Sequence, residues 1–291
     1  MSIVFDNVSY TYNPKTSFEK AALRDISLTI EEGDFFGIIG HTGSGKSTLI
    51  SHINGLTKIM SGRITVGGFE LAAKKDKTRG RKYKKPDYKQ LRAYAGMLFQ
   101  YPEHQLFDET VADDVGFGPR NLRLDKDEID ARVRKAIELV GLDYDEVAAK
   151  SPFELSGGQK RRVAFAGVIA MEPKVLILDE PTAGLDPRGK AEIMALVRRL
   201  KENCPTIIMV SHNMDEIAEN CNRIAVLNGG RLEFVLPPRE LFRNHERLRE
   251  LRLDVPTAAR IAGLLADKGW DIDRGICTMG ELADEIVKYK I

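Results

Sequence analysis

Short apolar runs alternate with longer amphipathic stretches along most of this chain. The apolar runs have the length of buried strands and occupy residues 35–39, 97–99, 175–178, 207–210 and 224–227. From residue 191 the apolar positions instead mark one face of a helix, at Ile193, Met194, Leu196, Val197 and Leu200. Strands that are apolar throughout and joined by helices are typical of parallel sheets covered on both faces. The pattern therefore predicts an α/β fold built on a mainly parallel sheet.

The two ends of the chain depart from this pattern. Residues 3–5, 8–12 and 26–30 suggest short strands of an N-terminal antiparallel β subdomain. After residue 235, Pro237 and Pro238 interrupt the chain, and the last predicted helix opens with a capping box of Thr278 and Glu281. We predict a main domain over residues 1–235 and a small helical extension over residues 236–291, with a packing or interface role.

Composition and charge exclude several classes of protein. The 291 residues are 43% hydrophobic and 30% charged, which excludes wholesale disorder. The net charge of +1 gives no general reason to expect a nucleic-acid binder. The three cysteines are scattered, which fits a reducing compartment and not a structural zinc site. The N-terminus does not resemble a secretion signal, and no apolar run approaches the roughly 18 residues of a spanning helix, so we expect a chain that does not cross a membrane.

The strongest chemical motif follows the first of these apolar runs. Residues 40–47 read GHTGSGKS, a complete G-x-x-x-x-G-K-[ST] phosphate loop between a predicted strand and a predicted helix. The glycines let backbone N–H groups point at phosphates, Lys46 adds positive charge, and the Ser47 hydroxyl suits Mg²⁺. A chance glycine-rich turn is the alternative, and the strand–loop–helix context disfavours it. The predicted nucleotide-binding residues are Gly40, Gly43, Ser44, Gly45, Lys46, Ser47 and Thr48.

Two carboxylates follow the apolar run at 175–178. A buried strand carries Asp179 to the carboxyl edge of the sheet, where phosphate-loop proteins bind Mg²⁺. Glu180 beside it is suited to activate a water molecule against the γ-phosphate of a nucleotide. A surface or helix-start glutamate is the alternative, and the intact phosphate loop favours the catalytic interpretation.

A second glycine motif narrows the choice among phosphate-loop proteins. LSGGQ at residues 155–159 opens a predicted helix with backbone amides and a hydroxyl that suit phosphate. An ordinary helix N-cap explains Ser156, whereas two glycines weaken a helix start. No N-K-x-D motif for guanine occurs, which disfavours a GTPase. The residues predicted to contact nucleotide here are Ser156, Gly157, Gly158 and Gln159.

These motifs together resemble the ATP-binding-cassette (ABC) ATPases over about residues 1–235. The resemblance implies ATP and Mg²⁺ as ligands, a helical signature subdomain over about residues 101–170, and a signature that contacts the γ-phosphate held by the opposite subunit. It implies a D-loop at residues 181–186 and a switch role for His212, for which a structural strand-end histidine is the alternative. Tyr12 resembles the aromatic residue that stacks on adenine, although Tyr10 or sheet packing explains the same pattern. The resemblance implies a catalytic role for Lys46, Glu180 and His212. It implies contact with Mg²⁺ for Ser47, Asp179 and Gln100. Gln100 is also expected to bind nucleotide and to couple the site to a membrane partner.

A narrower resemblance comes from residues 99–107, which read FQYPEHQLF. This form, with similar matches at 39–43, 151–155 and 166–173, is similar to the second ATPase of energy-coupling factor (ECF) transporters, which import vitamins and some metal ions. The resemblance implies a second ATPase as partner, as a heterodimer or a homodimer, and a C-terminal extension that helps the two ATPases dimerise. It also implies a transmembrane coupling subunit contacted near residues 100–107 and a substrate-binding membrane subunit reached indirectly. Core packing is the alternative for Tyr101, Leu106 and Phe107.

One segment departs from the commoner pattern of the family. Residues 72–90 carry nine Lys or Arg side chains against two Asp side chains, with Gly80 and Pro86 among them. The composition predicts a surface loop. Contact with anionic lipid is one interpretation of its charge, and a solvated insertion is the favoured one.

The sequence therefore predicts an ABC-type ATPase that powers transport as a peripheral subunit at the cytoplasmic face of the cell membrane, without a nucleic-acid partner. One alternative is a soluble ABC ATPase that acts on nucleic acid or ribosomes. The chain lacks both the heptad arm and the second cassette that those proteins carry. The other alternative is a non-catalytic nucleotide-binding module, which Glu180 and His212 disfavour.

Overall fold

The main sheet of the molecule is six-stranded and almost wholly parallel. The computed structural model describes residues 2–73 and 85–288. The strand order is β10-β9-β3-β8-β7-β6, in which only β10 is antiparallel to its neighbour. All five apolar runs form strands of this sheet, so the predicted parallel sheet is confirmed. The strands are β3 (Phe35–Ile39), β6 (Ala95–Leu98), β7 (Val175–Asp179), β8 (Thr206–Val210), β9 (Arg223–Asn228) and β10 (Arg231–Leu236).

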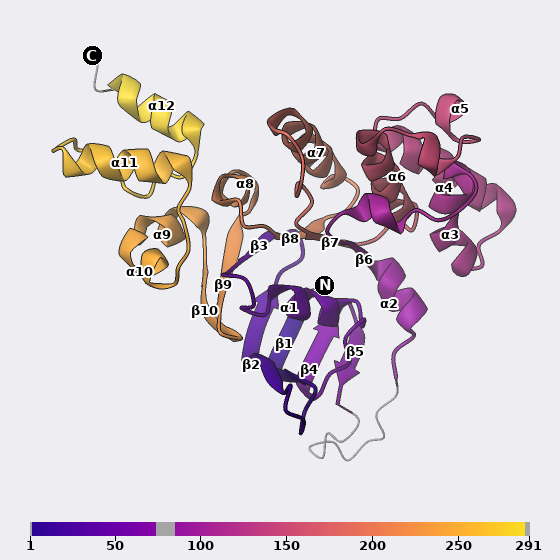
Figure 1. The fold of residues 1–291 in the computed structure, drawn as a ribbon, viewed down its shortest axis with the longest axis horizontal. Helices are drawn as coiled ribbons and strands as arrows, with labels where there is room; N and C mark the ends of the chain where they lie inside the picture. The colour runs from indigo at the N-terminus through magenta and orange to yellow at the C-terminus, as the bar shows by residue number, and fades with distance from the viewer. Residues whose placement is uncertain (1, 74–84, 289–291) are drawn as a thin grey trace.

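A second, antiparallel sheet of order β2-β1-β4-β5 lies beside the first (Figure 1). Its strands are β1 (Ile3–Tyr12), β2 (Lys20–Ile30), β4 (Ser61–Val66) and β5 (Phe69–Ala72). The prediction of two separate strands at 3–5 and 8–12 is wrong, because β1 is continuous. Asn7 has a φ of 49°, and the pairing of β1 with β2 shifts register between Phe5 and Val8. An asparagine tolerates this left-handed backbone, so the irregularity is absorbed as a bulge within the strand.

Helix α1 (Lys46–Ile53) joins the two sheets. Its apolar residues Leu49, Ile50 and Ile53 are fully buried in a core made with one face of the main sheet and the antiparallel sheet. A second core covers the other face of the main sheet. Because α1 is packed from both sides, the loop that precedes it is held firmly against the end of β3.

The remaining helices form two groups at opposite sides of the main sheet (Figure 1). One group holds α3 (Val111–Asn121), α4 (Lys126–Leu139), α5 (Tyr144–Val147) and α6 (Gly157–Ile169), with 3₁₀ turns at Pro102–Gln105 and Pro152–Glu154. The other is C-terminal and holds α9 (Pro238–Arg243), α10 (His245–Glu250), α11 (Thr257–Asp267) and α12 (Met279–Lys288). Between them lie α7 (Pro187–Leu200) and α8 (Met214–Asn220), whereas α2 (Tyr88–Tyr94) leads into β6 beside the antiparallel sheet (Figure 1).

Two expectations from the sequence concern the basic segment and the crossing of a membrane. Residues 74–84 of the basic segment lie outside the described residues, so its interpretation stays a prediction. Within residues 2–73 and 85–288, no helix combines the length and apolar character needed to span a bilayer.

Candidate functional site

The predicted site residues meet at the carboxyl edge of the main sheet. In the parallel register, Ile38 of β3 and Asp179 of β7 both pair with Val210 of β8, and β6 runs parallel beside β7. The chain segments that leave these strands therefore emerge side by side, at the edge where α/β proteins bind ligands. They begin with Gly40, Phe99, Glu180 and Ser211, and the second and fourth of these residues are followed by Gln100 and His212.

The phosphate loop is shaped by close backbone approaches. A Cβ atom on Gly40 would lie 2.4 Å from the carbonyl oxygen of Leu227. Gly45 has a φ of 108°, and a Cβ there would lie 2.5 Å from the carbonyl oxygen of Ala22. Both positions require glycine, because any side chain would push the loop away from β9 or β2. The buried Ser44 hydroxyl has no hydrogen-bond partner within the described residues, which leaves it available to a ligand.

Lys46 begins α1 directly after the loop. Its Nζ donates to the carbonyl oxygens of Gly40 at 2.7 Å and His41 at 3.2 Å. Burial lowers the pKa of Lys46, and the negative charges of Glu180 and Asp179 oppose that shift. A partly desolvated ammonium within a turn of oriented amides is the environment that suits a polyphosphate.

Asp179 and Ser47 form a pair of oxygen ligands. The two side chains are hydrogen-bonded, which lowers the pKa of Asp179, but burial raises that pKa by more. Glu180 raises it further and Lys46 lowers it. A half-buried carboxylate beside a hydroxyl fits Mg²⁺, which prefers hard oxygen ligands and takes one or two carboxylates together with phosphate oxygens. The donor set therefore fits the predicted metal.

Glu180 and His212 are in direct contact. The Nδ1 atom of His212 hydrogen-bonds the Oε2 atom of Glu180. Glu180 has a φ of 53° and its N–H donates to the carbonyl oxygen of Val210 at 2.9 Å. Glutamate seldom adopts this backbone region, and such strain concentrates at functional sites. The Glu180 side chain is 17% exposed whereas that of His212 is 76% exposed, so the imidazole lies on the solvent side of the carboxylate.

A cavity of about 170 Å³ lies beside the loop and is lined by Tyr12, Lys20, Ala22, Gly43, Gly45, Lys46, Ser47 and Thr48. The Tyr12 hydroxyl is 3.1 Å from the Thr48 hydroxyl, and its ring packs edge-to-face on Tyr10. Of the two tyrosines proposed for adenine, Tyr12 is the one that lines this cavity. Sequence reasoning missed Lys20 and Ala22, since neither belongs to a motif and β2 starts earlier than its apolar run suggests.

The LSGGQ residues lie apart from this cavity, and none of them lines it. Ser156 is the N-cap of α6 and forms a capping box with Gln159, so the N-cap interpretation of Ser156 is confirmed as geometry. A Cβ atom on Gly157 or Gly158 would meet nothing within 4 Å. The fold of this chain therefore does not require glycine at either position. Close approach of a ligand or a partner is a reason for glycine that remains.

Gln100, Tyr101 and Phe107 are exposed beyond β6, whereas Leu106 is buried and packs in the core, as its alternative interpretation predicted. The Gln100 side chain makes no hydrogen bond with any residue in the described ranges. Sequence reasoning missed the ion pair between Glu103 of this segment and Arg161 of α6, in which the arginine is buried, the glutamate is partly buried and the Nε–Oε2 distance is 2.9 Å. The KRR run at 160–162 reads as a charged surface face, so only an apolar neighbourhood visible in three dimensions identifies Arg161 as buried.

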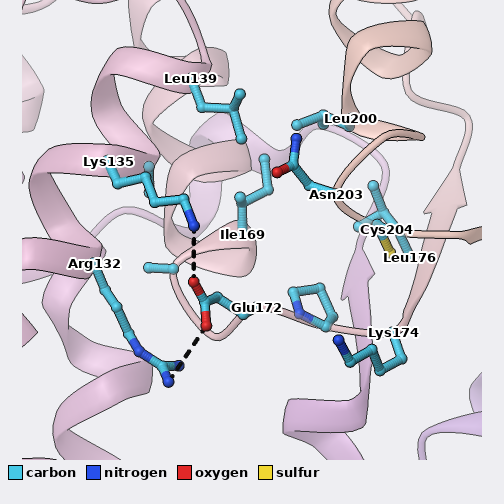
Figure 2. A pocket seen from close by; sticks show the side chains of 13 residues that line it. Arg132, Lys135, Leu139, Ile169, Glu172, Lys174, Leu176, Leu200, Asn203 and Cys204 are labelled. Atoms are coloured by element: carbon cyan, nitrogen blue, oxygen red, sulfur yellow. Dashed lines mark hydrogen bonds and ion pairs between the residues drawn. The ribbon is translucent and has the colours of Figure 1, made fainter. Parts of the chain in front are cut away.

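A separate pocket of about 230 Å³ lies between α4, the end of α7 and the loop before β7 (Figure 2). Figure 2 shows the Glu172 carboxylate between Lys135 and Arg132, with Nζ–Oε1 and Nη2–Oε2 distances of 3.0 and 3.4 Å. Lys174 leads into β7 and Cys204 precedes β8, so this pocket is at the amino edge of the sheet. It is therefore at the opposite edge from the phosphate loop and is not the candidate nucleotide site.

Comparisons with known proteins agree with this geometry. Residues 23–183 match the protein family described as ABC transporter. The chain is 48% identical over 289 residues to the energy-coupling factor transporter ATP-binding protein EcfA2 of Clostridium perfringens, covering 99% of this chain and 98% of that one. It is 50% identical over 281 residues to EcfA2 of Symbiobacterium thermophilum, covering 97% and 94%.

Solved structures give the same result. The chain resembles cbiO1 from Clostridium perfringens, part of the ABC transporter complex cbiONQ, with a TM-score of 0.70, 38% identity and coverage of 91% of this chain and 98% of that one. It also resembles the ATP-binding cassette MJ0796, a dimer bound to ADP and Pi, with a TM-score of 0.67, 27% identity and coverage of 81% and 98%. The chain is thus an ABC-type ATPase and belongs to the family of energy-coupling factor transporter ATP-binding proteins.

Proposed function

We propose that this chain is the ATP-hydrolysing peripheral subunit of an ECF-type importer, at the cytoplasmic face of the membrane, and that it powers uptake of a vitamin or other micronutrient. The observation that carries the proposal is the convergence of Lys46, Asp179 and Glu180 beside the phosphate loop. The charges of Glu180 and Asp179 raise the pKa of Lys46 against the effect of burial, and Lys46 in turn lowers the pKa of Asp179. Full-length similarity to ECF transporter ATP-binding proteins supports the transport role.

In this proposal the loop and Lys46 bind the β- and γ-phosphates of ATP, and Tyr12 packs against adenine. Ser47, Asp179 and Gln100 would hold Mg²⁺. The metal, when bound, neutralises charge on the phosphate oxygens. When ATP binds, the Lys46 ammonium exchanges the carbonyl oxygens of Gly40 and His41 for phosphate oxygens. It therefore has hydrogen-bond acceptors both before and after binding.

Glu180 accepts the proton of the water that attacks the γ-phosphate, and His212 holds the carboxylate in position. The hydrogen bond from the Glu180 backbone N–H to the Val210 carbonyl oxygen fixes the direction from which its side chain approaches. Since Glu180 is only 17% exposed, bulk water competes little for its oxygens.

A second ATPase completes each site in this proposal. Residues 156–159 do not line the cavity that contains Lys46, and the open space around Gly157 and Gly158 suits contact with nucleotide held by another chain. We propose a related ATPase as the partner in a heterodimer.

The coupling subunit of the membrane contacts a groove of about 430 Å³ between the 101–107 segment, α3 and α6. Its apolar lining includes Leu106, Phe107, Phe117, Val168 and Met171. Phe107 and Phe117 are 59% and 47% exposed and pack edge-to-face with a centroid distance of 5.0 Å. Large exposed aromatic side chains in a concave surface are typical of a protein contact, and a membrane-subunit helix is the occupant that we propose.

The C-terminal extension, over residues 236–291, is proposed to help the two ATPases dimerise. Its helices α11 and α12 form a small core of their own around Ala262, Ile276 and Leu282. Exposed apolar side chains remain on it, including Leu264, Met279 and Val287.

The experiment that tests this function is purification of the tagged chain from its native membranes. We expect integral membrane subunits and a second ATPase to co-purify in stoichiometric amounts. Recovery of ribosomes or nucleic acid in their place would instead support the soluble alternative, which the transporter relatives disfavour.

A further inference from the structure

Arg161 is the largest fully buried side chain among residues 2–73 and 85–288, at 1% exposure. Its Nε and Nη2 atoms donate to the two carboxylate oxygens of Glu103 at 2.9 and 3.0 Å. Its Nη1 and Nη2 atoms also donate to the carbonyl oxygen of Ala183, both at 3.1 Å. One buried guanidinium therefore holds a side chain from one segment and the backbone of another.

The three joined segments belong to three different motifs. Arg161 follows the LSGGQ residues in the first turns of α6. Glu103 lies in the 3₁₀ turn just after Gln100, in the segment that we propose faces the membrane subunit. Ala183 lies in the turn after Glu180, and its N–H donates to the Glu180 carbonyl oxygen at 3.0 Å.

A second contact joins two of these segments independently of Arg161. Gly184 has a φ of 76°, and a Cβ atom built there would lie 3.1 Å from the Tyr101 ring. The Tyr101 ring therefore packs over the turn that follows Glu180. Tyr101 itself has a φ of 55°, so the segment enters the 3₁₀ turn through an uncommon backbone conformation.

The chemistry of the guanidinium makes this link stiff. A bidentate arginine–carboxylate pair is strong and directional, and a buried guanidinium without its partners is strongly unfavourable. Water has little access to Arg161 and so cannot replace either partner. A displacement of Glu103 must therefore be followed by Arg161, and through it by the carbonyl of Ala183.

We infer that Arg161 is a positioning residue that fixes the turn behind Glu180 and transmits movement of the 100–107 segment to it. The transmission half of this inference rests on the proposed function, because it requires a membrane subunit at that segment. The positioning half requires only the ATPase.

The test compares Glu103→Leu/Arg161→Met with wild type in the purified ATPase pair and in proteoliposomes with the membrane subunits. Replacing both charges avoids a buried unpaired charge, and only the Ala183 carbonyl oxygen loses its donor, so we expect the melting temperature to change by only a few degrees. We expect ATP affinity and KM to stay within about twofold, kcat to fall about tenfold, and substrate taken up per ATP hydrolysed to fall at least about tenfold. Wild-type kcat and uptake per ATP in this variant would overturn the inference.

Arg162→Met is the matched control, since Arg162 is on the same helix but bonds the Val140 carbonyl oxygen and Glu192. It is expected to lower the melting temperature without changing uptake per ATP. An equal loss of kcat and coupling in this control would mean that Arg161 acts only through the stability of the helical arm.

Arg161→Lys covers the case in which the double variant does not fold, because lysine keeps the charge but cannot span both partners with the same geometry. In this variant too, kcat should fall while KM stays nearly unchanged. A wild-type kcat would again overturn the inference. If the wild-type complex shows no ATP-dependent uptake, the transport role itself fails. In that case the measurement of kcat and KM in the ATPase pair still tests the positioning role, because it does not require the membrane subunits.

Discussion

Glu180 and His212 are 32 positions apart in the chain, yet the His212 imidazole hydrogen-bonds the Glu180 carboxylate. Glu180 follows β7 and His212 follows β8, and these strands are parallel neighbours in register. The contact joins the residue proposed to activate water with the residue proposed to hold it in position. It is also the contact through which events at His212 can alter the orientation of the base.

Replacing Glu180 with Gln should separate binding from hydrolysis. Gln nearly keeps the size and hydrogen bonding of the side chain but cannot accept the proton, and general-base participation is typically worth about 10²–10⁴ in rate. ATP affinity, which depends on Lys46 and the loop amides, should stay within a few-fold of wild type. Single-turnover hydrolysis and ATP binding by the pair, with the partner ATPase's base also replaced, measure both quantities. A wild-type rate would show that Glu180 is only a surface carboxylate.

Asp179→Asn should stabilise the protein in the absence of ATP and Mg²⁺ while abolishing Mg²⁺-dependent hydrolysis. Burial raises the pKa of Asp179 above its ordinary value of 3.8, so the folded state holds the proton more tightly than the unfolded state. The ionised carboxylate therefore costs stability above the raised pKa, and stability recovers as the pH falls through that pKa.

Thermal melts over a pH series test this linkage. At pH 7.5 the Asn variant should melt a few degrees higher than wild type, since about 2–4 °C corresponds to 1 kcal/mol in a chain of this size. The difference should shrink as the pH falls toward 3.8. Asp130→Asn, an exposed position on α4, is the control and should leave the melting temperature unchanged. A lower melting temperature for Asp179→Asn at pH 7.5 would contradict the assignment.

Gly158→Glu should remove hydrolysis without harming the fold. A side chain at this position meets nothing within 4 Å in this chain, and an acidic residue in the first turn of a helix is mildly favourable. Its charge would repel nucleotide held by the opposite subunit, so we expect hydrolysis by the pair to fall at least about 100-fold. Lys126→Glu, at the exposed first turn of α4, is the matched control. Unchanged hydrolysis in Gly158→Glu would exclude a signature role for residues 156–159.

Asp215→Ala should loosen the C-terminal extension. Pro256 occupies the N-cap of α11 without a side-chain hydrogen bond, and Asp215 of α8 bonds the Thr257 N–H and hydroxyl at 2.7 and 2.9 Å instead. Loss of a cap of this kind costs about 0.5–2 kcal/mol. Hydrogen exchange should therefore quicken in α11 and leave α1 unchanged, whereas equal protection of α11 in both proteins would contradict this anchoring.

The parts of the fold that depend on local pattern could be predicted from the sequence, and the parts that depend on distant contacts could not. The strands of the parallel sheet are apolar throughout because both faces are covered, and so their prediction was confirmed. The antiparallel strands β4 and β5 are short and half-buried, and the sequence reasoning did not identify them. Lys46 and Asp179 belong to local motifs and could be identified from the sequence. Arg161 could not, because its partners Glu103 and Ala183 lie 58 and 22 positions away.

ATP-driven uptake is the measurement that tests the central claim most directly. Proteoliposomes that contain this chain, the co-purified second ATPase and the membrane subunits should accumulate the substrate that co-purifies with those subunits when ATP and Mg²⁺ are supplied at the side of the ATPases. A complex with Lys46→Ala in this chain should lose most of that uptake, because the charge–phosphate contact is worth about 1.5–3 kcal/mol, or about 10- to 100-fold in ATP affinity. Uptake that is unaffected by this substitution, or absent from the wild-type complex, would contradict the account.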